Sequence, residues 1–446
     1  MKISVVGLGK LGSPILAVLA SKGYEVVGVD INDDFVRKIN EGIAPCNEPL
    51  LQELISNSRS KIRATKSYDE AILETEATLV IVPTPSGKDG SFSNEYILGS
   101  MEQIGRSLAK KQGYHLVVIK STVMPGSTGG EIRNALEAAS NRTLGNDLGL
   151  CYSPEFIALG SVIRNLLSPD LILIGESDKK AGDMLESIYI TTCNNQPAIQ
   201  RMNFVNAEIA KISINTYVTT KISYANMLSD VCQHIEGADV DVVTAAVGID
   251  SRIGSKYLKS GVAFGGPCFP RDNVAFGALA RKIGARADIA FATQEINKHQ
   301  NHRLQTLIER HANTNKVGIL GLAYKPGTSV VEESQSIQIA NQLSEKGYQV
   351  SVYDPMALEE ARKVLVKDIR FTASVKECLK LSDTLIIMTP WPEFSTEITP
   401  AFLQNKTIID CWRLLSPAEC ANSCRLIHLG YGSEPTEILA LRKQNG

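Results

Sequence analysis

The sequence has 446 residues, with 46 lysines and arginines against 48 aspartates and glutamates, so its formal charge is −2 at pH 7. A charge so close to zero excludes a chain-wide attraction to nucleic acid or to an anionic membrane surface. A content of 43% hydrophobic and 21% charged residues excludes extended disorder. The length exceeds what one hydrophobic core usually supports, which predicts two or three domains.

The apolar segments are too short for a membrane span, because none reaches about eighteen residues. The apolar start at residues 3–8 is interrupted by Gly7, Gly9 and Lys10 before the core of a signal peptide could form. We therefore expect a cytoplasmic protein. The nine cysteines form no Cys-x-x-Cys pair and no cluster with histidine, so neither a disulfide framework nor a metal site is expected.

Two blocks of the chain alternate short apolar segments with longer amphipathic ones, the pattern of parallel sheets with crossover helices. Between them, residues 198–236 contain no glycine or proline and have apolar residues at helical spacing, which predicts one long helix. The fold class is therefore α/β, with two Rossmann-like doubly wound parallel-sheet domains joined by a central helical domain. The expected bounds are 1–196, 197–300 and 301–446. Strands are expected at residues 3–6, 26–29, 79–82, 116–119, 148–152 and 171–174, and at 317–320, 349–353, 385–388 and 407–409.

A glycine-rich turn follows the first predicted strand and reads Gly7-Leu8-Gly9-Lys10-Leu11-Gly12. The first glycine permits a tight turn, the second lets the main chain approach a pyrophosphate, and the third allows close packing of helix on strand. Asp30 ends the second strand, where a carboxylate accepts the ribose hydroxyls of NAD and repels the 2′-phosphate of NADP. The spacing predicts an NAD site, with a purely structural turn as the alternative.

A cysteine lies between paired glycines and an acid in the segment Phe264-Gly265-Gly266-Pro267-Cys268-Phe269-Pro270-Arg271-Asp272. The glycines leave space for a ligand, and a helix is expected after the proline. A cysteine is most often an inert apolar side chain, which stays the alternative. With an arginine nearby and a dinucleotide site elsewhere, we favour a thiolate nucleophile, with the acid handling a water proton.

Three further segments have the residue types of a ligand site. Lys211 and Asn215 lie four apart on the predicted helix and form a donor pair suited to an oxyanion, or else a solvated pair on the helix surface. The loops Val82-Pro83-Thr84-Pro85 and Ser121-Thr122-Val123 begin where predicted strands end, the edge at which nucleotides bind in such sheets. Capping of turns by hydroxyl groups is the alternative for both loops.

Taken together, these residues resemble the UDP-glucose/GDP-mannose dehydrogenase family from the first residue to roughly Leu415. The most specific stretch runs from Ser251-Arg252-Ile253-Gly254 through Lys259 to Asp272. Gly321-Leu322-Ala323-Tyr324-Lys325 resembles the family's nucleotide-binding third domain. The other segments that carry the resemblance are the amino-terminal glycine motif, Thr84-Pro85, Ser121-Thr122-Val123, Ser153-Pro154-Glu155-Phe156, and Asn206 to Asn215.

The resemblance implies a four-electron oxidation of a nucleotide-sugar C6 hydroxymethyl to a carboxylate, with two NAD reduced in succession. It implies that Cys268 forms a thiohemiacetal and then a thioester, that Lys211 and Asn215 stabilise negative charge, and that Asp272, Glu155 and Thr122 handle water and protons. The expected NAD-binding residues are Gly7, Leu8, Gly9, Lys10, Leu11, Gly12, Asp30, Thr84, Pro85, Ser121, Thr122 and Arg271. The expected sugar-nucleotide-binding residues are Glu155, Phe156, Ile157, Leu159, Lys211, Asn215, Arg252, Tyr257, Lys259, Phe264, Gly265 and Lys325.

The resemblance favours oxidation of UDP-glucose to UDP-glucuronate, and with it a part in nucleotide-sugar metabolism and polysaccharide biosynthesis. GDP-mannose, UDP-N-acetylmannosamine and UDP-N-acetylglucosamine stay alternatives, because one hydrogen bond or acetamide pocket decides among them. Three departures bear on that choice. Leu159 replaces a second glutamate, the segment 330–333 lacks the usual Asp-x-Arg, and the segment 410–413 only approximates Asp-Gly-Arg.

Two alternatives lie outside this reaction: a two-electron hydroxyacid dehydrogenase, and a non-catalytic protein that binds NAD or a nucleotide sugar. The first needs neither a cysteine nor a second nucleotide domain. The second is disfavoured because Cys268, Lys211, Asn215 and Asp272 are all present. The long middle helix, apolar on more than one face, predicts a homodimer or higher homo-oligomer built through the central domain.

Overall fold

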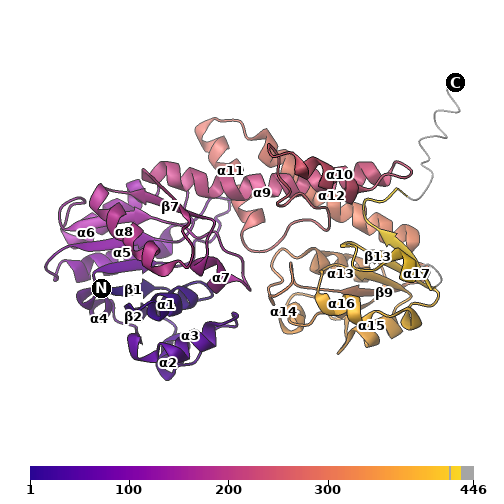
Figure 1. Ribbon diagram of the computed structural model, residues 1–446, viewed down its shortest axis with the longest axis horizontal. Helices are drawn as coiled ribbons and strands as arrows, with labels where there is room; N and C mark the ends of the chain where they lie inside the picture. Colours follow the sequence, from indigo (N-terminus) through magenta and orange to yellow (C-terminus); the bar gives the residue numbers. More distant parts are fainter. Residues whose placement is uncertain (421–422, 433–446) are drawn as a thin grey trace. The chain divides into compact units, whose positions relative to one another are not determined.

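The computed structural model describes residues 1–420 and 423–432 (Figure 1). The chain divides into two compact units, Met1–Ser213 and a second unit that begins at Ile214. Each unit contains one sheet with helices packed against it, as the alternating apolar and amphipathic segments predict.

The first unit is built on an eight-stranded sheet in the order β3-β2-β1-β4-β5-β6-β7-β8. The strand order reverses beside β1, so the connections after β1 and β4 leave the sheet on opposite faces. Every residue of β5 and β6 is buried, as expected for strands covered on both sides. The strands are β1 Lys2–Val6, β2 Glu25–Val29, β3 Ile62–Thr65, β4 Ala77–Val80, β5 His115–Ile119, β6 Leu148–Tyr152, β7 Leu171–Glu176 and β8 Ala198–Met202.

Helices cover both faces of this sheet, and alternate strand residues belong to two separate cores. One core packs against α1 (Gly12–Ser21), α2 (Asp33–Glu41) and α8 (Lys179–Thr192). The other packs against α4 (Tyr68–Glu74), α5 (Glu95–Leu108) and α6 (Arg133–Ser140). The short α3 (Leu51–Asn57) and α7 (Val162–Leu167) pack on α1.

The second unit contains a six-stranded, fully parallel sheet in the order β11-β10-β9-β12-β13-β14. This is the order of the first six strands of the other unit, so the two predicted Rossmann-like sheets are confirmed. The strands are β9 Lys316–Leu320, β10 Gln349–Tyr353, β11 Arg370–Phe371, β12 Thr384–Ile387, β13 Lys406–Asp410 and β14 Cys424–His428. The helices packed with them are α13 Gln335–Glu345, α14 Leu358–Arg362, α15 Val375–Leu381, α16 Pro392–Glu397 and α17 Pro417–Cys420.

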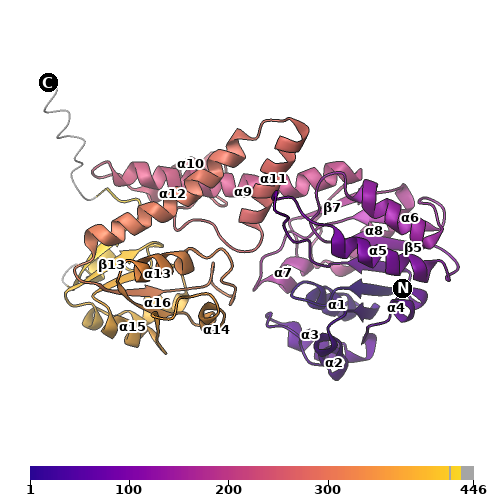
Figure 2. The ribbon, with the colours of Figure 1, turned by 180° about the vertical axis from the view of Figure 1, so that it is seen from behind.

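Four further helices precede the second sheet. The longest is α9, Phe204–Gln233, followed by α10 (Val240–Ile249), α11 (Phe269–Ile283) and α12 (Asp288–His311). The last two pack against each other (Figure 2). No helix among the described residues is long and apolar enough to cross a membrane. The three domain bounds expected from the sequence stay a prediction.

Three expectations are wrong in detail. Residues 198–202 form β8 rather than the first turn of the long helix, because they pair in parallel with β7 and Asn203 caps α9 by accepting from Asn206 N at 3.0 Å. The sheet of the first unit is not fully parallel, since β7 runs antiparallel to β6. The strand expected at 79–82 lies two residues earlier, because Ala77 and Thr78 pair with Ile3 and Ser4 of β1.

The two sheets carry a glycine turn and an acid at the same places. In the second, Gly321 follows β9 with φ +93° and Asp354 follows β10. Asp354 is fully buried and accepts from five donors at 2.7–3.1 Å. Because these donors occupy the carboxylate, Asp354 serves the fold rather than a ribose. The donors are Leu322 N, Ala323 N, Met356 N, Ala357 N and Trp391 Nε1.

The substitution Asp354→Asn tests this role, because it turns one acceptor oxygen into an NH₂ group facing main-chain donors. We expect the free energy of unfolding to fall by about 2–4 kcal/mol. Urea unfolding followed by tryptophan fluorescence measures it, since both tryptophans, Trp391 and Trp412, belong to the second unit. The matched control is the exposed Asp368→Asn, expected within about 0.5 kcal/mol of the parent protein. Equal urea midpoints for the two variants would contradict the assignment.

Candidate active site

The glycine turn after β1 has the geometry of a pyrophosphate cradle. Gly7 has φ +93°, and a Cβ there would lie 2.5 Å from the carbonyl oxygen of Ile81. A Cβ on Gly12 would overlap the carbonyl oxygen of Gly7, so α1 can begin only with a glycine at this position. A Cβ on Gly9 would meet nothing within 4 Å, which leaves its main chain open to a ligand. Leu8 is buried and Leu11 half-buried, whereas Lys10 is exposed.

Asp30 lies at the end of β2, where the ribose of a dinucleotide is expected. Its Oδ2 accepts from Leu8 N at 2.6 Å and its Oδ1 accepts from Asn32 N at 2.8 Å. Unlike Asp354 it is only half-buried, so each oxygen has a further lone pair directed away from these bonds. The turn and Asp30 therefore fit NAD.

The two polar loops beside this turn are joined to each other. The hydroxyl of Thr84 donates to the carbonyl oxygen of Thr122 at 2.8 Å, and that of Ser121 donates to the carbonyl oxygen of Val82 at 2.6 Å. The loops that follow β4 and β5 are thus held at one edge of the sheet. Pro85 is exposed and Thr122 half-buried.

Glu155 follows β6 and is held by two lysines. Its Oε1 forms an ion pair with Lys120, whose side chain is 1% exposed against 15% for Glu155. Its main-chain carbonyl accepts from Lys211 Nζ at 2.8 Å, and this ammonium lies 4.5 Å from the ring of Phe156. The structure therefore brings together three predicted site residues of the first unit.

A small hollow of about 20 Å³ lies beside Glu155, with room for about one water molecule. Glu155 and Tyr189 contribute polar groups to a lining that is otherwise mostly apolar. Two other predicted residues, Phe156 and Ile157, also line it, and Leu159 is half-buried nearby in the chain.

Cys268 is the N-cap residue of α11, and its side chain is exposed. Its carbonyl oxygen accepts from Asp272 N at 2.8 Å, which is the first turn of that helix. The N-terminal end of a fifteen-residue helix favours negative charge, so the cysteine lies where a thiolate is stabilised.

Asp272 is buried one turn further along α11. Asn215 Nδ2 donates to its Oδ2 at 2.6 Å, which links α11 to α9. The other oxygen, Oδ1, is buried and has no hydrogen-bond donor among the described residues; Arg271 Nε lies 3.7 Å away. A carboxylate oxygen without a donor can accept a hydrogen bond from water, so Asp272 is suited to acid–base work beside Cys268.

The glycines before Cys268 allow the loop to lie against the loop that follows β9. Gly266 has φ +83°, and a Cβ there would lie 2.5 Å from the ring of Tyr324. A Cβ on Gly265 would overlap the carbonyl oxygen of Glu333. Gly266 N donates to the carbonyl oxygen of Glu332 at 3.0 Å. The segment in which the usual arginine is missing thus supports the cysteine loop with its main chain.

Three side-chain amides hold the main chain of this loop. Asn297 of α12 accepts from Phe264 N at 2.8 Å and donates to Phe264 O at 2.9 Å. Asn226 of α9 accepts from Gly261 N at 3.0 Å, and Gln300 of α12 donates to Gly261 O at 2.6 Å. These bonds replace the strand partner that the loop lacks and fix its position.

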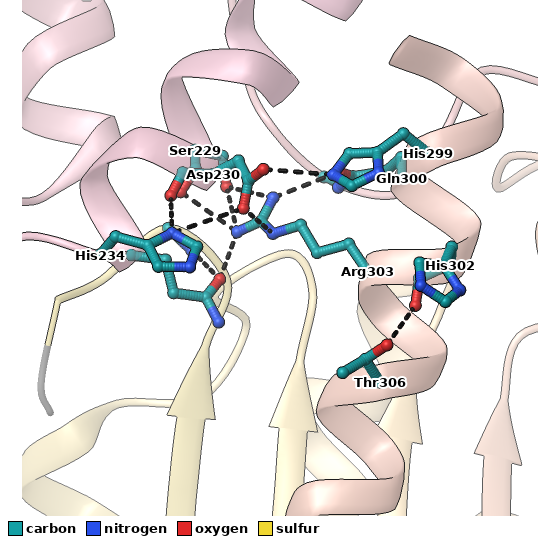
Figure 3. Close-up of polar contacts among 11 residues, drawn as sticks. Ser229, Asp230, His234, His299, Gln300, His302, Arg303 and Thr306 are labelled. Carbon is teal, nitrogen blue, oxygen red and sulfur yellow. Dashed lines mark hydrogen bonds and ion pairs between the residues drawn. The ribbon is translucent and has the colours of Figure 1, made fainter. Parts of the chain in front are cut away.

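The helices that carry the amides are themselves locked by a buried arginine (Figure 3). Arg303 of α12 pairs with Asp230 at 3.1 Å and donates to the carbonyl oxygen of Ser229 at 3.1 Å, both on α9. It also donates to Gln300 Oε1 at 3.2 Å, which orients that amide toward Gly261. Burial lowers the pKa of Arg303, but the guanidinium stays charged because its usual value is so high.

The remaining predicted sugar-nucleotide residues have side chains that are exposed or half-buried. Arg252 is 86% exposed and pairs with Asp250 at 2.6 Å. Tyr257 and Lys259 are exposed, whereas Lys325 is half-buried. Arg413, in the segment that approximates Asp-Gly-Arg, pairs instead with Asp239 at 2.6 Å.

Sequence reasoning missed two groups of residues here. Lys120 offered a signal, since it directly follows five apolar or buried strand residues and precedes a predicted ligand loop. Tyr189, Asn226, Asn297 and Gln300 offered none, because each lies within a helix and contacts a loop distant in the chain.

Comparison with known families matches three successive stretches of the chain. Residues 1–193 match the NAD binding domain of the UDP-glucose/GDP-mannose dehydrogenase family, residues 205–299 its central domain and residues 318–417 its UDP binding domain. The chain belongs to this family. Its cofactor is NAD, and it is an oxidoreductase that acts on a nucleotide sugar.

Two relatives and one solved structure show how close the similarity is. The chain is 35% identical to a UDP-glucose 6-dehydrogenase of Haloferax volcanii, over 94% of this chain and 98% of that one. It is 34% identical to a GDP-mannose 6-dehydrogenase of Pseudomonas putida, over 79% and 81%. The structure of a UDP-glucose dehydrogenase from Pyrobaculum islandicum superposes with a TM-score of 0.87 at 31% identity, covering 97% and 98%.

The amide pair of Asn297 gives a testable prediction. Asn297→Asp keeps an acceptor for Phe264 N but places a second oxygen against Phe264 O, which repels it. We expect kcat to fall about 10-fold with little change in the KM for NAD, because the loop that carries Cys268 moves away from its position. Steady-state kinetics measures this, with the exposed neighbour Lys298→Ala of α12 as control. Parent-like kcat in the aspartate variant would show that the loop does not need this amide.

Proposed function

We propose that the protein oxidises UDP-glucose to UDP-glucuronate, a four-electron oxidation at C6. The observation that carries this proposal is an exposed cysteine at the N-terminus of α11 with a buried, partly unsatisfied aspartate one turn on. A simple alcohol dehydrogenation needs no nucleophile, whereas a second oxidation through a covalent adduct does.

The similarity to UDP-glucose dehydrogenases over nearly the whole chain supports UDP-glucose as substrate. GDP-mannose is the second candidate, supported by the relative from Pseudomonas putida, which matches over a smaller share of the chain. UDP-N-acetylmannosamine and UDP-N-acetylglucosamine stay alternatives for the same chemistry. Leu159 and Glu332 are the positions at which we expect the choice of sugar to be made, because they replace polar or charged family residues.

We assign the binding of NAD to the glycine turn, Asp30, the loops of Thr84-Pro85 and Ser121-Thr122, and Arg271. The bound cofactor would supply the hydride acceptor for each of the two oxidations. Arg252, Tyr257, Lys259, Phe264, Gly265 and Lys325 would hold the sugar nucleotide together with the residues around Glu155.

In the first oxidation, Lys211 and Asn215 would stabilise negative charge on the C6 oxygen as its proton leaves. The Cys268 thiolate then bonds to the aldehyde carbon, and the oxygen takes up a proton to complete a thiohemiacetal. Loss of that proton and a second hydride leaves a thioester. Asp272 and Glu155, with Thr122 placing the water, would take the proton of the water that attacks the thioester carbon and releases the thiolate.

The yield of NADH per sugar tests the reaction. With excess NAD and a limiting amount of each candidate sugar nucleotide, we expect two NADH per UDP-glucose, because each oxidation reduces one NAD. Absorbance at the NADH band measures this. Two NADH from another sugar would keep the mechanism and change the substrate, and one NADH per sugar would contradict a four-electron oxidation.

Replacing the nucleophile tests the covalent step. We expect Cys268→Ser to stop carboxylate formation and to trap sugar as an ester, detectable as added mass on the intact protein. Cys46→Ser, a half-buried cysteine of the first unit, is the matched control and should turn over normally. Normal turnover by the Cys268 variant would rule out this nucleophile.

A homodimer through α9 is the second part of the proposal. Tyr217, Tyr224, Met227 and Val231 recur at helical spacing and are 38–65% exposed, so they form one apolar stripe of this helix. A continuous exposed stripe of this kind fits a second copy of the same helix. We further expect the protein to act in the cytoplasm and to serve polysaccharide biosynthesis.

Light scattering tests the dimer. We expect twice the mass of one chain for the parent protein and the mass of one chain for Met227→Asp/Val231→Asp, since buried carboxylates disfavour association. Ile190→Asp, at an exposed apolar position of α8, is the control and should stay dimeric. A parent protein with the mass of one chain would contradict the assembly.

A further inference from the structure

A buried lysine lies behind the proposed acid–base residue of the first unit. Lys120 directly follows β5, and 1% of its side chain is exposed. Removing an ammonium from water costs several kcal/mol unless charged or hydrogen-bonding partners compensate. The partners that compensate this cost therefore indicate what the charge of the lysine does.

The partners of Lys120 are the carboxylate of Glu155 and the hydroxyl of Tyr189 on α8. Burial alone would lower the pKa of Lys120, but the charge of Glu155 together with the hydrogen bonds to Glu155 and Tyr189 outweighs it, and the pKa of this ammonium is raised. Lys120 therefore stays protonated throughout the working range of the enzyme. It cannot serve as a base, and its burial keeps it from contacting the sugar.

Tyr189 completes the arrangement. Burial raises the pKa of its hydroxyl, so it stays a phenol, which accepts from the ammonium of Lys120 and shares a hydrogen bond with Ser153 Oγ at 2.6 Å. Ser153 and Glu155 both lie in the loop that follows β6. The hydroxyl of Tyr189 contacts Ser153 directly and Glu155 through Lys120, so it connects two residues of this loop. The ammonium of Lys120 thus lies between the hydroxyl of Tyr189 and Oε1 of Glu155.

The charge around Glu155 comes from two ammonium groups. Lys120 contacts its carboxylate, and Lys211 of α9 contacts its main-chain carbonyl. Two neutral titratable groups face the pair from α8, Tyr189 within the helix and Cys193 at its C-terminal end, and burial raises the pKa of both. The hollow beside Glu155 admits about one water molecule, so bulk water screens the lysine–glutamate pair weakly.

We infer that Lys120 is a positioning residue for the reaction: with Tyr189 behind it, its ammonium holds Oε1 of Glu155 and keeps this carboxylate aimed as the base. Lys211 fixes the main chain of Glu155, so this residue is held both at its main chain and at its carboxylate. This inference rests on the proposed role of Glu155 and adds two residues that do not touch the substrate.

The test replaces the ammonium by an apolar group of similar length, Lys120→Met, in the full-length protein. Because an opposite charge beside a base favours its ionised form, we expect removal of this ammonium to move the acid side of the pH–kcat profile up by about one pH unit or more. We also expect kcat at neutral pH to fall about 10-fold or more, with the KM for UDP-glucose little changed. A variant with an unchanged pH profile, or with a raised KM alone, would overturn the inference.

Two further variants show whether Lys120 acts through Glu155. We expect Lys120→Met/Glu155→Gln to have the kcat of Glu155→Gln alone, because the lysine has nothing left to hold. Losses that multiply in the double variant would mean an independent role and would overturn the inference. Lys179→Met, an exposed lysine of α8 paired with Asp183, is the matched control and should match the parent protein.

Thermal unfolding and NAD binding confirm that each variant is folded before its kinetics are compared. If Lys120→Met does not fold, Tyr189→Phe takes its place, because it keeps both charges and removes only the phenolic oxygen. It should shift the acid side in the same direction by a smaller amount, and an unchanged profile would overturn the inference. Two NADH per sugar from the parent protein, with unaltered pH profiles in both variants, would remove this inference and leave the proposed function intact.

Discussion

The reversal of strand order beside β1 is the constraint on which the site of the first unit depends. Because the connections after β1 and β4 leave on opposite faces, their loops separate at the carboxyl edge of the sheet. The glycine turn, Asp30, the loop of Thr84 and the loop of Ser121 all lie along that edge, each directly after its own strand. Lys120 and Glu155 follow β5 and β6 at the same edge, which is why they can form an ion pair despite their distance in the sequence.

The second unit repeats the sheet but uses its acid differently. Asp354 has five hydrogen-bond donors and is fully buried, whereas Asp30 has two and is half-buried. The same topology therefore supports a dinucleotide site in one sheet and a structural anchor in the other. The difference lies in side chains such as Trp391, whose indole nitrogen donates to the carboxylate that would otherwise face a ribose.

The loop that carries Cys268, the proposed nucleophile, is positioned by hydrogen bonds to its main chain rather than by a neighbouring strand. It is held by Asn226, Asn297 and Gln300, and Arg303 fixes the helices that carry them. An amide can accept and donate at once, so the side chain of Asn297 satisfies both main-chain polar groups of Phe264. These bonds hold the loop while the side chain of Cys268 stays exposed.

The sequence by itself determined the fold class and the cofactor, because these depend on local patterns, and it supplied the candidates for the reacting groups. Central strands appear as continuous apolar segments, and the glycine turn and the Cys268 segment are each contiguous. The four strands that the sequence did not reveal, β3, β8, β11 and β14, are the edge strands of the two sheets. Edge strands are partly exposed and carry polar residues such as Arg63 and Gln200, so the apolar signal is absent. Only the tertiary structure decided which polar side chains face one another: Lys120 with Glu155, Asn215 with Asp272, and Arg413 with Asp239. Each of these contacts joins elements that are far apart in the chain, so no local sequence pattern indicates that they meet in the folded protein.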